Sequence, residues 1–228
     1  QVAEVAQKVA KEKYGLDVEL VTFNDYVLPN EALSKGDIDV NAFQHKPYLD
    51  QQIKDRGYKL VSVGNTFVYP IAGYSKKIKS LDELQPGSQI AVPKDPTNLG
   101  RSLLLLQQVG LIKLKEGVGL LPTSLDVVEN PKNLKIVELE APQLPRSLDD
   151  AQIALAVINT TYASQIGLTP AKDGIFVEDK NSPYVNLIVA REDNKDAENV
   201  KKFVQAYQSD EVYEAANKIF NGGAVKGW

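Results

Sequence analysis

Residues 89–110 read QIAVPKDPTNLGRSLLLLQQVG, and this stretch decides the fold class. Its apolar start, Gln89–Val92, predicts a β-strand, and the leucine-rich run Asn98–Val109 predicts an α-helix that stops at Gly110. The same order recurs earlier in the chain, where Ile38–Phe43 reads as a strand that leads into a helix. Strands that alternate with helices predict an α/β fold with largely parallel sheets covered on both faces.

Two stretches near the start of the chain predict further elements. Val2, Val5, Ala6 and Val9 recur at helical spacing and predict an amphipathic helix in a stretch that opens at the first residue. The run 18–23 is rich in β-forming residues and predicts a strand.

The length of 228 residues fits one large domain or two lobes of about 100 residues each. No low-complexity linker separates two halves. Two strand-like stretches of similar character, Tyr69–Tyr74 and Tyr184–Ala190, bracket about half of the sequence. If there are two lobes, we expect the chain to cross between them through these strands.

Composition and charge exclude several classes of function. The chain has 26 Lys and Arg against 30 Asp and Glu, a formal net charge of −4. That balance offers no basic footprint for nucleic acid and no polybasic attraction to anionic lipid. Cysteine is absent, so disulfides, thiol catalysis and thiolate metal sites are excluded.

Residues for enzymatic chemistry are scarce. His45 is the only histidine, so no histidine pair can bind a metal and no second histidine can complete a catalytic relay. Asp149 and Asp150 are adjacent carboxylates, a pattern more typical of a solvated helix start than of an acid–base pair. No Walker loop, GxGxxG, GxSxG or HExxH motif occurs. We predict no enzyme activity, no catalytic residues, no cofactor and no metal.

Residues for binding gather at strand ends. The stretch 41–48, NAFQHKPY, places Phe43, His45 and Tyr48 where a strand meets a helix. Ligand pockets in open α/β sheets lie at the carboxyl ends of strands. The alternative interpretation is that Phe43 and Tyr48 belong to the core and that His45 is an ordinary surface residue.

Arg101 lies in a second strand-to-helix connection, DPTNLGRS at 95–102. Backbone N–H groups and the positive end of the helix dipole gather at such a point, and a cation in the first turn is unfavourable for the helix itself. A guanidinium there suits a carboxylate ligand, which it can hold in a bidentate fashion. We therefore expect removal of Arg101 to cost the free protein little stability. The alternative is an exposed or ion-paired arginine.

Two asparagines are further candidates. Asn159 directly follows the apolar strand Ile153–Ile158, although asparagine is also a favoured helix N-cap. Asn186 lies inside the strand-like run 184–190, where asparagine is depleted. A buried amide needs hydrogen-bond partners, and a ligand could supply them.

Taken together, five runs resemble the methionine-binding lipoproteins of the NlpA family, which serve a methionine ABC importer. The resemblance covers essentially the whole chain and is carried by Asp39–Tyr48, Tyr69–Tyr74, Asp95–Leu106, Ser147–Thr160 and Pro183–Ala190.

The resemblance implies a two-lobed periplasmic-binding-protein fold of the α/β class, with the ligand cleft between lobes joined by two strand crossings. Lobe one is expected to comprise residues 1–74 and 185–228, and lobe two residues 75–184. The implied function is capture of L-methionine in the periplasm and its delivery to the membrane-embedded ABC transporter, by a monomer that binds no nucleic acid.

The resemblance also implies a binding site. Arg101 would hold the α-carboxylate, while Asn159 and Asn186 would offer amide oxygens to the α-ammonium. The apolar slot for the side chain would be lined by four residues, with Tyr69 as a further wall: Tyr26, Phe43, His45 and Tyr48.

Family members carry a lipid-modified cysteine and an opening strand ahead of the helix that begins here at Gln1. The resemblance therefore implies inner-membrane lipid anchoring of the full-length protein, and a lobe one that lacks its expected first strand in this sequence. Three alternatives remain: a binder of the same fold for another amino acid or a methionine-containing dipeptide, a periplasmic enzyme, and a lipoprotein whose surface role, such as adhesion, matters more than transport.

Overall fold

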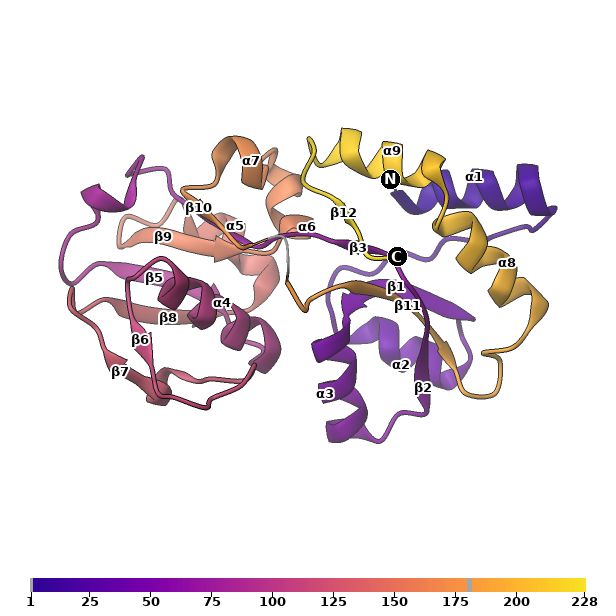
Figure 1. Ribbon diagram of the computed structural model, residues 1–228, viewed down its shortest axis with the longest axis horizontal. Helices are drawn as coiled ribbons and strands as arrows, with labels where there is room; N and C mark the ends of the chain where they lie inside the picture. Colours follow the sequence, from indigo (N-terminus) through magenta and orange to yellow (C-terminus); the bar gives the residue numbers. More distant parts are fainter. Residues whose placement is uncertain (1, 180–181) are drawn as a thin grey trace. The chain divides into compact units, whose positions relative to one another are not determined.

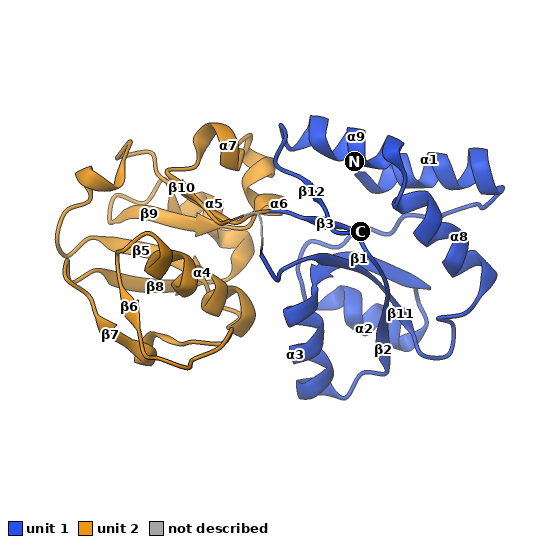
Figure 2. Ribbon diagram, in the orientation of Figure 1, with its two compact units in different colours: residues 1–69, 181–228 blue, residues 70–180 orange. Residues whose placement is uncertain are grey.

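The computed structural model describes residues 2–179 and 182–228. The chain forms two compact units: residues 1–69 with 181–228 make unit 1, and residues 70–180 make unit 2 (Figure 2). The division lies a few residues before each boundary expected from the sequence. Strand β4 (Ala72–Tyr74) pairs with a strand of unit 2, so it does not belong to unit 1 as expected. Tyr184, expected in lobe two, instead packs on His45 of unit 1.

Unit 1 is built from both ends of the chain (Figure 1). Its helices are α1 (Val2–Tyr14), α2 (Leu28–Lys35), α3 (Lys46–Arg56), α8 (Glu198–Tyr207) and α9 (Asp210–Ile219). Its strands are β1 (Val40–His45), β2 (Leu60–Asn65), β3 (Phe67–Val68), β11 (Asn186–Arg191) and β12 (Val225–Lys226). The predicted N-terminal helix is confirmed as α1, which buries Val2, Ala6 and Val9; Gln1 lies outside the described residues.

The sheet of unit 1 corrects the expectation of largely parallel pairing. Its order is β1-β11-β2, and β11 runs antiparallel to both neighbours. The physical reason is the return of the chain: β11 enters unit 1 from the second half of the sequence and fills the place between β1 and β2. The strand predicted over residues 18–23 is also wrong, because residues 15–23 form no helix or strand.

Unit 2 is built around a five-stranded sheet of order β10-β4-β9-β5-β8. β5 pairs in parallel with β8 and β9, while β4 and β10 extend the sheet antiparallel. Its strands are β4, β5 (Gln89–Pro93), β6 (Lys113–Leu114), β7 (Val127–Glu129), β8 (Lys135–Leu139), β9 (Ile153–Ile158) and β10 (Phe176–Val177). Its α-helices are α4 (Pro96–Gln108), α5 (Leu144–Ser147), α6 (Thr160–Ala163) and α7 (Pro170–Asp173). Short 3₁₀ turns are η1 (Leu81–Glu83), η2 (Ser124–Asp126), η3 (Ala141–Gln143) and η4 (Ser164–Ile166).

Helix α4 organises the core of unit 2. Asp95 is its N-cap and Pro96 its first residue, a position where the missing N–H of proline costs nothing. Leu103, Leu105 and Leu106 are almost fully buried and pack with apolar residues of the central sheet. The strand and helix predicted from residues 89–110 are therefore confirmed, with the helix starting two residues earlier than expected. Within residues 2–179 and 182–228, the helices are all too short or too polar to cross a membrane.

Gly100 lets α4 approach the loop that follows β6. A Cβ added at this position would lie 2.4 Å from the backbone oxygen of Leu120 and 3.1 Å from Cδ of Pro122. Backbone cannot move aside as a flexible side chain can, so only glycine fits here without a shift of the loop or the helix.

We predict that Gly100→Ala lowers stability although alanine is the better helix former. The propensity gain of about 1 kcal/mol should be outweighed by overpacking of about 1–3 kcal/mol. Urea unfolding measures the change, and Gln108→Ala, at an exposed position of the same helix, serves as a control expected to lie within about 0.5 kcal/mol of the parent. A more stable Gly100→Ala variant would contradict the close approach.

Candidate functional site

Three predicted aromatic residues lie together in unit 1. Tyr26 precedes α2, Phe43 is on β1, and Tyr48 lies in the first turn of α3. Their ring centroids are 6.0 Å apart in each of the three pairs. The Tyr48 hydroxyl donates to the backbone oxygen of Tyr26 at 2.7 Å, which ties the loop before α2 to α3. Tyr26 and Phe43 are half-buried residues, whereas Tyr48 is buried.

His45 joins this group from the end of β1. It is the N-cap of α3, and its Nδ1 accepts the backbone N–H of Tyr48 at 3.1 Å. A neutral imidazole that accepts at Nδ1 carries its proton on Nε2. The ring is buried and packs edge-on against Tyr184 with centroids 5.1 Å apart. His45 is therefore not the surface residue of the alternative interpretation. We call Tyr26, Phe43, His45, Tyr48 and Tyr184 the aromatic cluster.

Three buried amides hold the strand that carries the aromatic cluster. Asn30 and Gln44 exchange two hydrogen bonds of 2.9 and 2.7 Å, and Asn41 donates to the side-chain oxygen of Asn30 at 3.0 Å. The pairing of β1 with β11 is irregular between Asn41 and Gln44. The amides supply hydrogen bonds at this irregularity, on both sides of Phe43 in the strand.

The surroundings of Tyr69 and Asn186 do not by themselves mark these two residues as part of a binding site. The ring of Tyr69 packs against Phe67 and Phe220 at 6.0 and 4.8 Å, within the core of unit 1, and its burial raises the pKa of its hydroxyl well above the usual value. Asn186 is the first residue of β11, opposite His45 in the strand register. It is only half-buried, so the argument from a fully buried strand amide does not apply to it.

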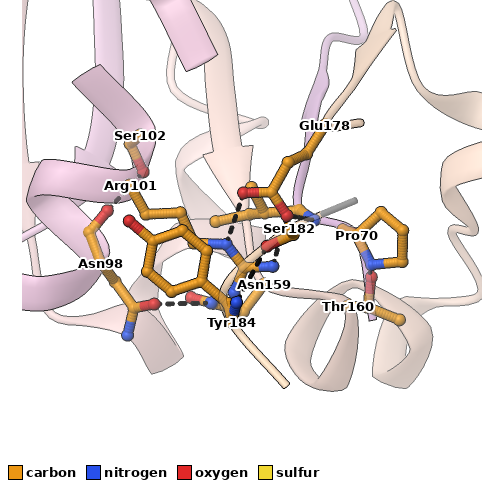
Figure 3. A network of polar contacts seen from close by, with 10 residues as sticks. Pro70, Asn98, Arg101, Ser102, Asn159, Thr160, Glu178, Ser182 and Tyr184 are labelled. Carbon is orange, nitrogen blue, oxygen red and sulfur yellow. Dashed lines mark hydrogen bonds and ion pairs between the residues drawn. The ribbon is translucent and has the colours of Figure 1, made fainter. Parts of the chain in front are cut away.

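Arg101 in unit 2 is held by a carboxylate of the protein itself. Its Nε and Nη2 donate to the two oxygens of Glu178 at 2.8 and 2.6 Å, a bidentate pair (Figure 3). The side chains of Arg101 and Glu178 are only 4% and 10% exposed. This is the ion-paired alternative. Because α4 begins at Pro96, Arg101 also lies beyond its first turn, where the effect of the helix dipole has faded.

Asn159 is linked to α4 by a short chain of hydrogen bonds. Asp95 accepts from both the backbone and the side-chain nitrogen of Asn98, at 3.1 and 3.0 Å. The side-chain oxygen of Asn98 then faces Asn159 and accepts from its Nδ2 at 3.3 Å (Figure 3). Burial of Asp95 raises the pKa of its carboxyl group, although its hydrogen bonds work against that shift.

The chain of hydrogen bonds orients the Asn159 amide. Since Asp95 accepts hydrogen bonds, Asn98 turns its NH₂ group toward Asp95 and its oxygen toward Asn159. Asn159 must then use its NH₂ group on Asn98. Its Oδ1 is left buried, with no hydrogen-bond partner among residues 2–179 and 182–228. Asn159 is the N-cap of α6 by position, but its side chain makes no capping bond. A buried acceptor without a partner marks a place where a ligand could donate.

The sequence-based reasoning missed three residues that complete these groups. Glu178 lies in sequence far from Arg101, and nothing in the run 174–179 indicates that its carboxylate is buried. Asn98 lies within the run 95–102 but has no feature in the sequence that marks it as a binding residue, and the pattern around Tyr184 predicts only a strand. Among the described residues, no group of three or more His, Asp or Glu side chains could hold a metal ion.

We predict that Arg101→Met destabilises the ligand-free protein by about 3–5 kcal/mol, because it leaves the Glu178 carboxylate buried and unpaired. This prediction replaces the sequence-based expectation that removal of Arg101 costs the free protein little stability. The double variant Arg101→Met/Glu178→Leu should lose less than the single variant. Urea unfolding of stripped protein measures both.

The control is Lys76→Met, which breaks an exposed ion pair with Asp149 and should cost no more than about 1 kcal/mol. If Arg101→Met costs as little as this control, the loss of Arg101 does not leave the Glu178 carboxylate buried and unpaired.

Comparisons with known proteins agree with the geometry. The family model of the NlpA lipoproteins matches residues 1–228. The D-methionine-binding lipoprotein MetQ of Salmonella typhimurium is 95% identical over 228 residues, which are 100% of this chain and 84% of that protein.

Two solved structures have the same fold. A nutrient-binding protein from Burkholderia cenocepacia, bound to methionine, is 56% identical with a TM-score of 0.96, over 100% of this chain and 95% of that chain. A periplasmic substrate-binding protein of an ABC transporter from Coxiella burnetii is 52% identical with a TM-score of 0.96, over the same shares. The predicted mixed α/β periplasmic-binding-protein fold is thus confirmed, and the chain belongs to the NlpA lipoprotein family.

Proposed function

We propose that this chain is the substrate-binding protein of an ABC importer and that its ligand is methionine. The observation that carries the proposal is the 95% identity, over the whole chain, to a protein named for binding D-methionine. The structure supports it in two ways: unit 2 holds a cation and an unsatisfied acceptor, and unit 1 holds an aromatic cluster in which Tyr26 and Phe43 are half-buried. No residue is assigned a catalytic role.

Unit 2 is proposed to recognise the groups common to all α-amino acids. Asn98 and Arg101 are three residues apart on α4 and therefore lie on the same face of the helix. Asn98 also orients the Asn159 amide, so the Asn159 oxygen and Arg101 are both positioned by α4. The α-ammonium of the ligand would donate to that oxygen, and the α-carboxylate would accept from Arg101. Asn186 of unit 1 remains a proposed second acceptor for the ammonium.

The aromatic cluster is proposed to recognise the ligand side chain. A thioether sulfur contacts aromatic rings favourably, and the half-buried faces of Tyr26 and Phe43 offer such contacts. Tyr69 is proposed only as an outer wall.

The proposal includes a cellular setting. The importer is expected to receive the ligand in the periplasm from a monomeric binding protein whose full-length form is anchored to the inner membrane by lipid. The membrane-embedded transporter is the proposed protein partner, and nucleic acid is not one.

Calorimetric titration of ligand-stripped protein tests the ligand class. L-methionine is the proposed ligand, with D-methionine and a methionine-containing dipeptide as comparison ligands. Norleucine keeps the length of the side chain and should bind measurably. Glutamate and serine would bury a polar group without a partner, at roughly 1–3 kcal/mol or more, so they should bind at least about tenfold more weakly. An affinity for glutamate or serine equal to that for methionine would contradict the proposal.

Two kinds of variant separate the proposed roles. Arg101→Lys and Asn159→Ala should weaken methionine and norleucine by the same factor, about ten- to hundredfold, because each loses a charge-assisted hydrogen bond to the ligand backbone. Phe43→Leu should instead reduce the preference for methionine over norleucine by up to about tenfold, because it removes a ring contact with sulfur. A Phe43→Leu variant with an unchanged preference would remove Phe43 from the side-chain pocket.

A further inference from the structure

Glu178 holds Arg101 in a way that surface ion pairs of this chain do not. In every other ion pair found among the described residues, at least one side chain is more than half exposed. The Arg101–Glu178 pair is buried on both sides and bidentate. Buried pairs contribute little net stability in general, so stability alone does not account for this one.

Glu178 is itself fixed in place. Its backbone N–H donates to the oxygen of Ile71 at 2.9 Å, and its Oε1 also accepts from the N–H of Ile71 at 3.4 Å. The backbone bond fixes the position of residue 178, and the carboxylate cannot swing away without losing its own contact with the N–H of Ile71. A ligand carboxylate that approaches Arg101 meets a guanidinium whose charge is already paired with a carboxylate.

The charge balance decides which ligands are tolerated. Three ionisable groups on α4 or paired with it make up its charge network: the guanidinium of Arg101, its partner Glu178, and the N-cap Asp95. A zwitterionic amino acid adds no net charge to this network. A carboxylic acid without an ammonium adds a negative charge that no residue of the network offsets, and burial makes such a charge costly.

We propose that Glu178 is a specificity-determining residue: by balancing the charge of Arg101, it makes the site select zwitterionic α-amino acids over carboxylic acids that lack the α-ammonium. This inference rests on the proposed function, because it requires that Arg101 contacts the ligand carboxylate. Glu178 acts through Arg101 and is a positioning residue rather than one that contacts the ligand side chain.

The test compares two ligands on ligand-stripped full chain by calorimetry. L-methionine carries both charges, and 2-hydroxy-4-(methylthio)butanoate replaces the ammonium by a hydroxyl while keeping the carboxylate and the thioether. The parent protein should bind the hydroxy acid at least about a hundredfold more weakly than methionine. The hydroxy acid lacks the ammonium and therefore loses its two proposed charge-assisted contacts, with Asn159 and Asn186. Glu178→Gln keeps the size of the side chain and removes its charge. It should lower the ratio of the affinity for methionine to that for the hydroxy acid by about tenfold or more.

Glu178→Asp is the matched control, because it keeps the negative charge and should leave the ratio close to that of the parent. If Glu178 has only a structural role, Glu178→Gln will lower the affinity for both ligands by the same factor. The ratio of the two affinities will then be unchanged, and the inference is overturned. Should Glu178→Gln fail to fold, the parent still decides: equal affinity for both ligands overturns the inference.

The two proposals fail in different ways. If the parent binds no methionine, or if Arg101→Lys leaves methionine binding unchanged, the proposed function of the site is wrong. If methionine binds and Arg101→Lys weakens it while Glu178→Gln leaves the ligand ratio unchanged, only the role of Glu178 is wrong.

Discussion

The bidentate contact between Arg101 and Glu178 is the interaction on which the chemistry of unit 2 depends. A guanidinium that is almost fully buried loses its hydration and needs a partner with matching geometry, which the two carboxylate oxygens provide at 2.6 and 2.8 Å. Its position is set by α4, and α4 is set in turn by its N-cap Asp95 and by the close approach at Gly100. Helix, cation and counter-charge thus form one assembly rather than three independent features.

The two units use polar groups in opposite ways. In unit 1, the amides of Asn30, Asn41 and Gln44 satisfy one another, so they stiffen β1 beneath the aromatic cluster without being available to a ligand. In unit 2, the hydrogen bonds that begin at Asp95 end at an Asn159 oxygen with no partner among the described residues. A satisfied network gives rigidity, and an unsatisfied end gives a place to bind.

The sequence was sufficient to predict those elements that are determined by residues close together in the chain. The strand and helix of residues 89–110 follow from apolar runs, Pro96 and Gly110, and the grouping of Phe43, His45 and Tyr48 follows from their spacing across a strand end and a helix start. It could not predict Glu178 as the partner of Arg101, because 77 residues separate them and only the folded sheet joins them. The antiparallel β11 was missed for the same reason: pairing between distant strands has no local signal. The run 18–23 shows that a local pattern alone is not enough. Its residues favour a β-strand, but no strand among the described residues pairs with it.

The order of β11 between β1 and β2 has a consequence for how the chain folds as it is made. Unit 2 is one continuous stretch, residues 70–180, whereas the sheet of unit 1 needs a central strand from residues 186–191. Domains generally fold as units while synthesis proceeds from the N-terminus. We expect the inserted unit to form its core first. The edges of β1 and β2 stay unpaired until β11 is synthesised, more than 120 residues after β2 ends at Asn65. During that interval the first 69 residues present exposed strand edges, which are sites for chaperone binding or aggregation.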